Sequence, residues 1–204
     1  MSQIDLWEIE NEYFDAGIKL ICGVDEAGRG PLAGPVCAAA VILPPHIELP
    51  GLNDSKKLTD KRRRELFPLI KDAAIAYGIG FATHEEIDTI NILQATYLAM
   101  ERAIAQLQVT PEQLLIDGNR AKDFGISTRT VVKGDSLSAS IAAASVLAKV
   151  SRDDLMLKAA EEYPHYGFEI HKGYGTKAHY EALSSYGPSP IHRITFLKTF
   201  YGEK

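Results

Sequence analysis

The sequence predicts an α/β domain with a mixed five-stranded sheet flanked by helices and followed by a C-terminal helical extension. Two observations carry this prediction: apolar runs of strand length recur along the chain, and longer segments with helical spacing of apolar residues lie between them. A length of 204 residues suits one domain with a small appendage. A hydrophobic fraction of 46% supplies enough apolar surface for a core.

Five segments have the length and composition of β-strands: residues 19–25, 35–43, 77–83, 113–117 and 127–132. A turn rich in glycine and proline joins the first two, and a long helical pattern follows each of the second, third and fifth. This order of elements predicts a sheet that contains both antiparallel and parallel strands.

Three long segments have helical spacing, and two short helices complete the chain: residues 59–76, 84–107, 136–162, 176–185 and 191–201. Thr59 is in place to act as the N-cap of the first helix, whereas Pro68 disturbs its interior. The chain thus divides into an N-terminal segment, an α/β domain and an extension, with bounds 1–18, 19–162 and 163–204.

The net charge of −5 is concentrated at the N-terminus, where five acids precede the first basic residue, Lys19. The remaining 22 acids are matched by 22 lysines and arginines, so the local distribution says more than the isoelectric point. Basic residues crowd the stretch 56–64, beginning with Lys56 and Lys57. This stretch is either a phosphate-binding patch or a solvated helix face, and composition does not separate the two.

No apolar run approaches the length of a membrane span, and the first 20 residues are acidic rather than signal-like. Cys22 and Cys37 lie in apolar runs and are interpreted as buried, reduced thiols, in preference to a disulfide. We therefore expect a cytoplasmic protein that has no membrane contact.

The turn "GRGPLAG" does not fit a nucleotide-binding motif. Its glycines have the spacing G-x-G-x-x-x-G, and a strand rather than a helix follows it, so the dinucleotide fingerprint fails. The sequence also lacks the G-K-[ST] of a P-loop.

Acidic residues follow apolar runs at several strand ends. Asp25 and Glu26 end the first strand, Asp117 ends another, and Asp135 lies between a strand and a helix. A continued strand would direct Asp25 and Glu26 to opposite faces, but Gly28 lets the chain leave the strand, so both carboxylates can reach one place. Their repulsion favours hard divalent cations such as Mg²⁺ or Mn²⁺.

Two of these acids also have ordinary structural interpretations. Asp117 precedes a glycine and can be a turn former, and Asp135 can be a helix N-cap. At this point both interpretations stay open for each residue.

The extension holds four of the six histidines: His165, His171, His179 and His192. Their spacing is wrong for zinc. Interleaved with tyrosines, lysines and Arg193, they predict a polar and stacking surface for nucleic acid. An ordinary helical surface with structural histidines is the alternative.

Six stretches together resemble the bacterial ribonuclease HII family, the type 2 ribonucleases H. In chain order they are "GVDEAGRGPLAGPV", "LNDSKKLTDKRR", "IDGN", "VKGDSLSASIAAASVLAKVSRD", "HKGYGTKAHYEAL" and "GPSPIHRITF", between residues 23 and 196. Thr195, where many relatives place serine, is a conservative departure.

The resemblance implies a ribonuclease H-like fold with a C-terminal substrate-binding extension. It implies that Asp25, Glu26, Asp117 and Asp135 are the catalytic metal ligands, for Mn²⁺ or Mg²⁺. The implied reaction is two-metal hydrolysis of the RNA strand in RNA–DNA hybrids, and of duplex DNA at single embedded ribonucleotides, leaving 5′-phosphate and 3′-hydroxyl ends. The enzyme is expected to be a monomer.

Six residues are predicted to bind the substrate: Gly28, Arg29, Gly30, Lys56, Lys57 and Tyr174. The glycines that flank Arg29 would let backbone approach a 2′-hydroxyl, the group that distinguishes RNA from DNA. The lysines would contact phosphates. The resemblance places Tyr174 at the RNA-to-DNA junction, whereas its ordinary interpretation is an anchor for the loop between helices.

Three alternatives stay open: another nuclease of the same fold, a hybrid-binding module without catalysis, and a carboxylate-metal phosphatase for small molecules. The complete set of acids argues against the second, and the basic stretch at 56–64 argues against the third.

Overall fold

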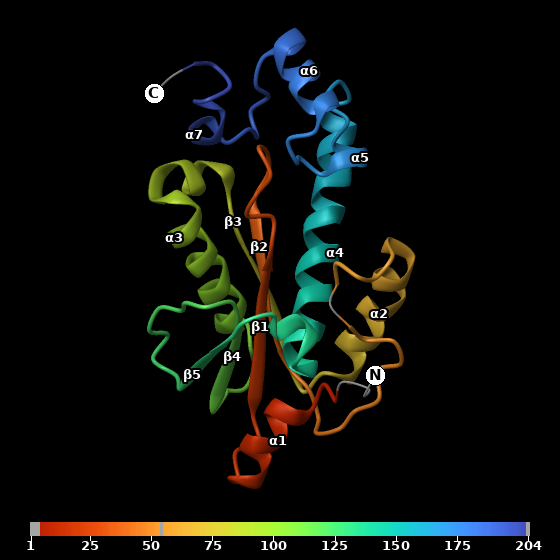
Figure 1. The fold of residues 1–204 in the computed structure, drawn as a ribbon, viewed down its shortest axis with the longest axis vertical. Coiled ribbons are helices and arrows are strands. Elements are labelled where there is room, and N and C mark those ends of the chain that lie inside the picture. The colour runs from red at the N-terminus through yellow and green to blue at the C-terminus, as the bar shows by residue number, and fades with distance from the viewer. Residues whose placement is uncertain (1–4, 54, 203–204) are drawn as a thin grey trace.

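The computed structural model describes residues 5–53 and 55–202 and contains one five-stranded sheet with helices on both faces (Figure 1). The strands are β1 (Ile21–Ala27), β2 (Val36–Ile42), β3 (Ala76–Ala82), β4 (Gln113–Asp117) and β5 (Thr128–Val131), in the order β3-β2-β1-β4-β5. β1, β2 and β3 pair antiparallel, whereas β1, β4 and β5 pair parallel. The predicted mixed sheet of five strands is confirmed.

Three long helices cover the sheet: α2 (Asp60–Ala73), α3 (His84–Ala105) and α4 (Ala139–Glu162). In Figure 1, α3 lies on one side of the strands and α4 with α2 on the other, and an apolar cluster fills each interface. The predicted N-cap is confirmed, because the Thr59 hydroxyl accepts a 3.2 Å hydrogen bond from the Arg62 amide. α2 continues through Pro68, and α3 is kinked at Asn91.

α4 packs directly on the backbone of β1, at Gly23. A Cβ on this residue would lie 2.1 Å from the carbonyl carbon of Ser140, in the first turn of α4. Only glycine permits this approach. The contact fixes the start of α4, and the turn before it, against the strand that carries Asp25.

The acidic N-terminal segment forms a helix, α1 (Glu8–Asp15), that the sequence analysis did not predict. Glu10 is fully buried, and its Oε1 accepts hydrogen bonds from the Ser138 hydroxyl at 2.6 Å and the Ser140 amide at 3.0 Å. Burial raises the pKa of the Glu10 carboxyl. The segment thus supports the N-terminus of α4; residues 1–4 of it lie outside the described residues.

Short helices form the C-terminal extension: α5 (Phe168–His171), α6 (Lys177–Tyr186) and α7 (Ile194–Leu197). Figure 1 shows them beyond one end of the sheet, around the distal end of α4, and an apolar cluster joins them to that helix. Residues 203–204 lie outside the described residues.

The expected helix over 191–201 is wrong in most of its length. The backbone of residues 191–193 pairs instead with the turn after β1: Gly34 donates to the Ile191 carbonyl at 2.9 Å, and Arg193 donates to the Leu32 carbonyl at 2.8 Å. These bonds hold the segment extended and leave only the four residues of α7 helical.

None of the helices within residues 5–53 and 55–202 combines the length and the apolar composition of a membrane span.

Candidate active site

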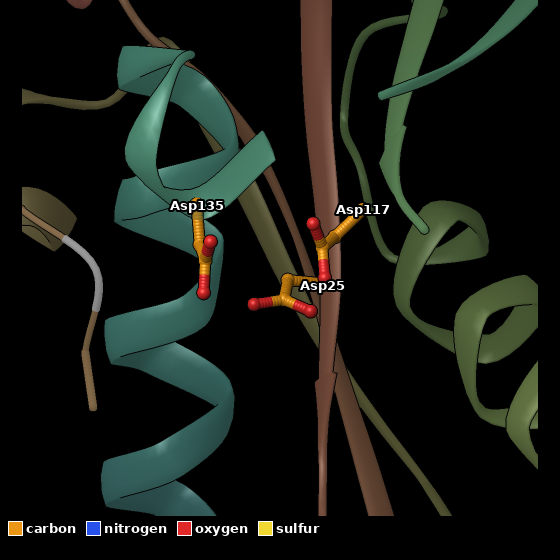
Figure 2. A group of neighbouring side chains, drawn as sticks. All are labelled: Asp25, Asp117 and Asp135. Atoms are coloured by element: carbon orange, nitrogen blue, oxygen red, sulfur yellow. The ribbon is translucent and has the colours of Figure 1, made fainter. Parts of the chain in front are cut away.

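Three aspartates converge near the C-terminal ends of β1 and β4 and the turn before α4, and Figure 2 shows their carboxyl groups facing a common space. One carboxylate oxygen from each of Asp25, Asp117 and Asp135 lies within 4.8 Å of the other two. Asp25 and Asp135 are buried, and Asp117 is half-buried. Oxygen atoms at this spacing could hold a hard divalent cation.

The sheet itself brings Asp25 and Asp117 together. β1 and β4 are parallel neighbours, and Val24 pairs with Ile116, so the next residue of each strand emerges at the same edge. Along β1, alternation directs Gly23 and Asp25 towards α4, which is also the face that the turn before α4 covers.

Asp135 comes from a 3-10 turn, η1 (Gly134–Ser136), between β5 and α4. The N-cap of α4 is Ser138, whose hydroxyl accepts a 3.2 Å hydrogen bond from Ile141. The capping role that the sequence left open for Asp135 therefore belongs to Ser138. The Gly134 amide donates to Asp117 Oδ1 at 2.7 Å, which ties the turn to β4.

Glu26 is not one of the three converging carboxylates. The predicted strand ends at residue 25, whereas β1 continues to Ala27 and the chain leaves it at Gly28. Alternation within the strand therefore turns Glu26 towards α3, away from the face of Asp25. There Glu26 and Asp117 line a common pocket of about 290 Å³, together with Arg29 and residues of α3. Arg29 forms an ion pair with Glu26 at 3.3 Å.

The acids are electrostatically strained in the absence of a cation. Burial raises the pKa of Asp25 well above its usual range, and the charges of Glu26 and Asp117 raise it further. Burial also raises the pKa of Glu26, although Arg29 opposes the shift. A bound dication would relieve this repulsion.

Lys56 and Lys57 extend over the same site rather than away from it. Lys56 Nζ lies 3.3 Å from Asp135 Oδ2, and Lys57 Nζ lies 3.3 Å from the Ser136 hydroxyl. The Lys56 side chain is 76% exposed, so solvent and a ligand can reach it. Both lysines thus face the site, and the choice between a phosphate-binding patch and a solvated helix face stays open.

The turn that follows β1 lies against Tyr174. A Cβ on Gly30 would be 3.6 Å from Cε1 of the exposed Tyr174 ring. Gly28 has a φ of +95°, and a Cβ there would lie 1.9 Å from Nε of Arg152. The structure therefore brings together the backbone and the ring that the sequence assigned to substrate binding, and Arg29 of the same turn pairs with Glu26.

Two buried arginines hold this turn: Arg152, which the sequence analysis missed, and Arg193, which it placed on a nucleic-acid surface. Arg193 donates to the carbonyls of Gly28 at 2.6 Å and Arg29 at 2.9 Å. Arg152 donates to the carbonyl of Ala33 at 3.1 Å. Arg152 lies among charged residues of α4, so its sequence neighbours gave no signal of burial, and its carbonyl partners come from distant loops.

The expected nucleic-acid surface of the extension is wrong for most of its histidines. His171, His179 and His192 are buried, as is Arg193. The three histidine rings point inward because their nitrogens form hydrogen bonds with loop carbonyls and, between His179 and His192, with each other. His165, by contrast, is exposed. The alternative of structural histidines is therefore the better description of the three buried rings.

Comparison with known proteins gives one consistent result. The family model described as Ribonuclease HII matches residues 22–199. The chain is 55% identical over 189 residues to a ribonuclease HII of Clostridioides difficile (strain 630), which covers 93% of this chain and 74% of that protein. It is 58% identical over 179 residues to a ribonuclease HII of Dechloromonas aromatica (strain RCB), which covers 88% and 91%.

Among solved structures, the crystal structure of the ribonuclease H2 from Pyrococcus horikoshii OT3 has a TM-score of 0.69 at 27% identity. The match covers 86% of this chain and 92% of that one. The chain therefore belongs to the ribonuclease HII family of metal-dependent endoribonucleases.

Proposed function

We propose that this protein hydrolyses the RNA strand of RNA–DNA hybrids and also cuts duplex DNA at single embedded ribonucleotides. The observation that carries the proposal is the convergence of three aspartate oxygens within 4.8 Å at the ends of β1 and β4. Membership of the ribonuclease HII family supports the substrate class.

Asp25, Asp117 and Asp135 would hold divalent cations, and Glu26 would contribute from the α3 side through the pocket it shares with Asp117. The residues fit such ions, because every donor is a carboxylate oxygen, and burial together with the charges of Glu26 and Asp117 raises the pKa of Asp25. Mn²⁺ and Mg²⁺ both suit this donor set. When bound, two such ions supply an activated water and neutralise charge on the leaving oxygen, which gives 5′-phosphate and 3′-hydroxyl ends.

The turn of Gly28, Arg29 and Gly30 would recognise the ribose. Gly30 and Arg29 are exposed beside the carboxylates, and Arg193 fixes the carbonyls of Gly28 and Arg29. Backbone without a side chain can approach the 2′-hydroxyl, which both donates and accepts hydrogen bonds. The turn proposed to recognise the ribose would thus lie close to the carboxylates whose cations would bind the scissile phosphate.

Tyr174 would test the next sugar for the absence of a 2′-hydroxyl. Its ring is 43% exposed and lies against Gly30 on one side and over the Arg152 guanidinium at 6.0 Å. A sugar packed on this ring has no room for a further hydroxyl. This assignment explains how one turn and one ring together would define an RNA-to-DNA junction.

Lys56 and Lys57 would bind phosphates on the approach to the carboxylates. Lys56 lies beside Asp135 and can exchange that contact for a substrate phosphate when cations occupy the aspartates. Residues 19–162 would act as the catalytic domain and residues 163–204 as the substrate-binding extension. A cytoplasmic monomer stays a prediction, and the buried free cysteines suit a reducing compartment.

Three duplexes of identical sequence test the proposal: one with a single ribonucleotide, one with a continuous RNA strand, and one of DNA alone. We expect cleavage of the first two only when Mg²⁺ or Mn²⁺ is present. Binding without cleavage would instead identify a hybrid-binding module.

The same duplexes test the role of Tyr174. Tyr174→Ala should lower cleavage at the single ribonucleotide more than cleavage of continuous RNA, at equal salt. Tyr186→Ala is the matched control, because that ring is 59% exposed in the same extension but stacks on His165 instead. Equal losses on both substrates would show that Tyr174 does not read the junction.

A further inference from the structure

We propose that His179 and His192 are positioning residues for Tyr174: a chain of hydrogen bonds through their rings holds the Tyr174 carbonyl and so places the tyrosine ring beside Gly30. The inference rests on the proposed function, because it explains how Tyr174, the residue proposed to recognise the RNA-to-DNA junction, is held in place. Both histidines are buried, with 0% and 1% exposure, and neither can reach substrate.

The chain of hydrogen bonds has three links. The Ser189 amide lies 2.9 Å from His192 Nδ1. His192 Nε2 lies 2.9 Å from His179 Nε2. His179 Nδ1 lies 2.9 Å from the Tyr174 carbonyl oxygen.

The two ends of this chain fix every proton in it. The Ser189 amide can only donate, so His192 Nδ1 accepts from it, with the Ser189 hydroxyl 2.8 Å away as a second neighbour. A neutral His192 then carries its hydrogen on Nε2. The Tyr174 carbonyl can only accept, so His179 Nδ1 carries a hydrogen, and a neutral His179 has a bare Nε2. The middle link is then a normal bond from His192 Nε2–H to His179 Nε2. Both ends lead to the same arrangement independently.

The hydrogen-bond partners of a third ring, that of His171, also determine which of its nitrogens carries the hydrogen. The Gly173 amide donates to His171 Nδ1 at 3.2 Å, so His171 Nε2 carries the hydrogen that the Tyr166 carbonyl accepts at 2.7 Å. The His171 and His179 rings are stacked, with centroids 4.4 Å apart. A proton added to either ring would place positive charge against a neighbouring imidazole, and the His179 proton would also face an N–H.

The surroundings keep the rings neutral. Phe168 packs on His179 and His192, with ring centroids 5.5 Å and 5.8 Å away. Burial lowers the pKa of His192 to about 4, with smaller effects of other histidines that include His84 on α3. The charged groups nearest to His171 are Glu169 and Lys172, which act in opposite directions on its pKa.

The chain joins two segments that face each other across the Gly30–Tyr174 contact. At one end, Tyr174 belongs to a loop with left-handed backbone at Lys172 and Gly173, where the φ angles are 52° and 86°. At the other end, His192 forms a β-bridge with Ala33, in the turn that carries Gly30. The Leu32 amide also donates to the Gly173 carbonyl at 2.8 Å, and Arg152 donates to the Lys172 carbonyl at 3.0 Å. Loss of the His179 donor therefore loosens the Tyr174 side of the loop relative to Gly30 without releasing the loop.

Nitrogen NMR of the wild-type protein tests the chain without a variant. Histidine ¹⁵N shifts at pH 7 should identify His179 as the Nδ1–H tautomer and His171 and His192 as Nε2–H tautomers. We expect the same tautomers at pH 5.5, where an imidazole in a model peptide is mostly protonated. An Nε2–H tautomer or a protonated ring at His179 would overturn the proposal, whatever the variants do.

Substrate preference tests the positioning. His179→Phe keeps a ring but removes the donor, whereas in His179→Asn the amide nitrogen takes the place of Nδ1 and can still donate to Tyr174. We expect His179→Phe to lower the ratio of cleavage at a single ribonucleotide to cleavage of continuous RNA about fivefold, the factor for one hydrogen bond of about 1 kcal/mol. His179→Asn should restore most of the ratio.

A double-mutant cycle separates positioning from general loosening. If His179 acts through Tyr174, His179→Phe should leave the ratio unchanged in a Tyr174→Ala background. A further fall there, or equal losses on both substrates, would contradict the inference while wild-type cleavage at the single ribonucleotide still supports the proposed function. A wild type that does not cut that duplex would contradict the proposed function instead.

Discussion

Replacement of Asp25 by Asn should stabilise the metal-free protein while it removes activity. Asp25 shares its site with carboxylate oxygens within 4.8 Å, and at an effective dielectric constant of about 20 one such pair of charges repels by about 3.5 kcal/mol. The raised pKa of Asp25 lets protonation relieve part of this repulsion, so we expect a gain of about 1–3 kcal/mol in the free energy of unfolding. Asn keeps the acceptor for the Glu26 amide, which donates to Asp25 Oδ1 at 2.7 Å.

Urea unfolding in EDTA and in Mg²⁺ measures this effect at pH 7.5. In EDTA the variant should be the more stable protein. The difference should shrink as the pH falls and vanish below about 4, the ordinary pKa of an unfolded aspartate, because Asp25 is then neutral in both the folded and the unfolded chain. Mg²⁺ should stabilise wild type, by about 2.7 kcal/mol at a hundred times the dissociation constant, and the variant less.

Asp153→Asn is the matched control for Asp25→Asn. Asp153 is equally buried but paired with Lys149 at 2.7 Å, so its loss should destabilise the protein. An Asp25→Asn variant that is less stable than wild type in EDTA, or equally stabilised by Mg²⁺, would refute the electrostatic reasoning.

Three further predictions concern the surroundings of the carboxylates. Gly28→Ala should lower thermal stability and cleavage of both substrates, since its Cβ would meet Arg152 Nε at 1.9 Å with φ at +95°; unchanged melting would show that the turn can move. Replacement of Lys56 and Lys57 by Ala should reduce the slope of the log binding constant against log salt concentration by about one for each phosphate contact that is lost, while the position of the cut stays the same. An unaltered slope would show that both lysines face solvent and bind no phosphate. The pKa of His192 is lowered to about 4, below the ordinary 6.5 of the unfolded chain. The neutral ring therefore stabilises the fold by roughly 3 kcal/mol above pH 6.5, and this contribution should be lost as the pH falls from 6.5 to 4. A His192→Gln variant whose stability falls with acid as much as that of wild type would contradict this.

The sheet and the positions of the acids could be predicted from the sequence because their signals are local. Apolar runs of strand length end at Asp25 and at Asp117, and a glycine follows the latter at once. The sequence did not predict that β1 and β4 are parallel neighbours, because strand pairing joins residues far apart in the chain. That pairing is what turns two separate acids into a site.

The supporting structure around the site could not be predicted in the same way. The direction of the Glu26 side chain depends on whether β1 continues past residue 25, and strand ends are predicted less reliably than the strands themselves. The sequence contains no sign that three polar residues are buried: Arg152, His179 and His192. Their hydrogen-bond partners are carbonyls and amides of loops, and the residues next to them in the chain do not reveal these partners. Buried polar groups of this kind are satisfied by tertiary partners, which a pattern of residue types does not contain.

The central claim is that the converging aspartates hold the metal ions that cleave the RNA strand, and Asp117→Asn tests it most directly. Asn can still accept the Gly134 amide that now lies 2.7 Å from Asp117 Oδ1, so the turn before α4 should stay in place. Asp123→Asn is the control in the following loop, where the side chain accepts the Gly125 amide at 2.7 Å. At saturating Mg²⁺ we expect Asp117→Asn to lose on the order of a thousandfold or more in cleavage rate while it still folds and binds the ribonucleotide-containing duplex. Near-normal turnover of Asp117→Asn under the same conditions would contradict the account.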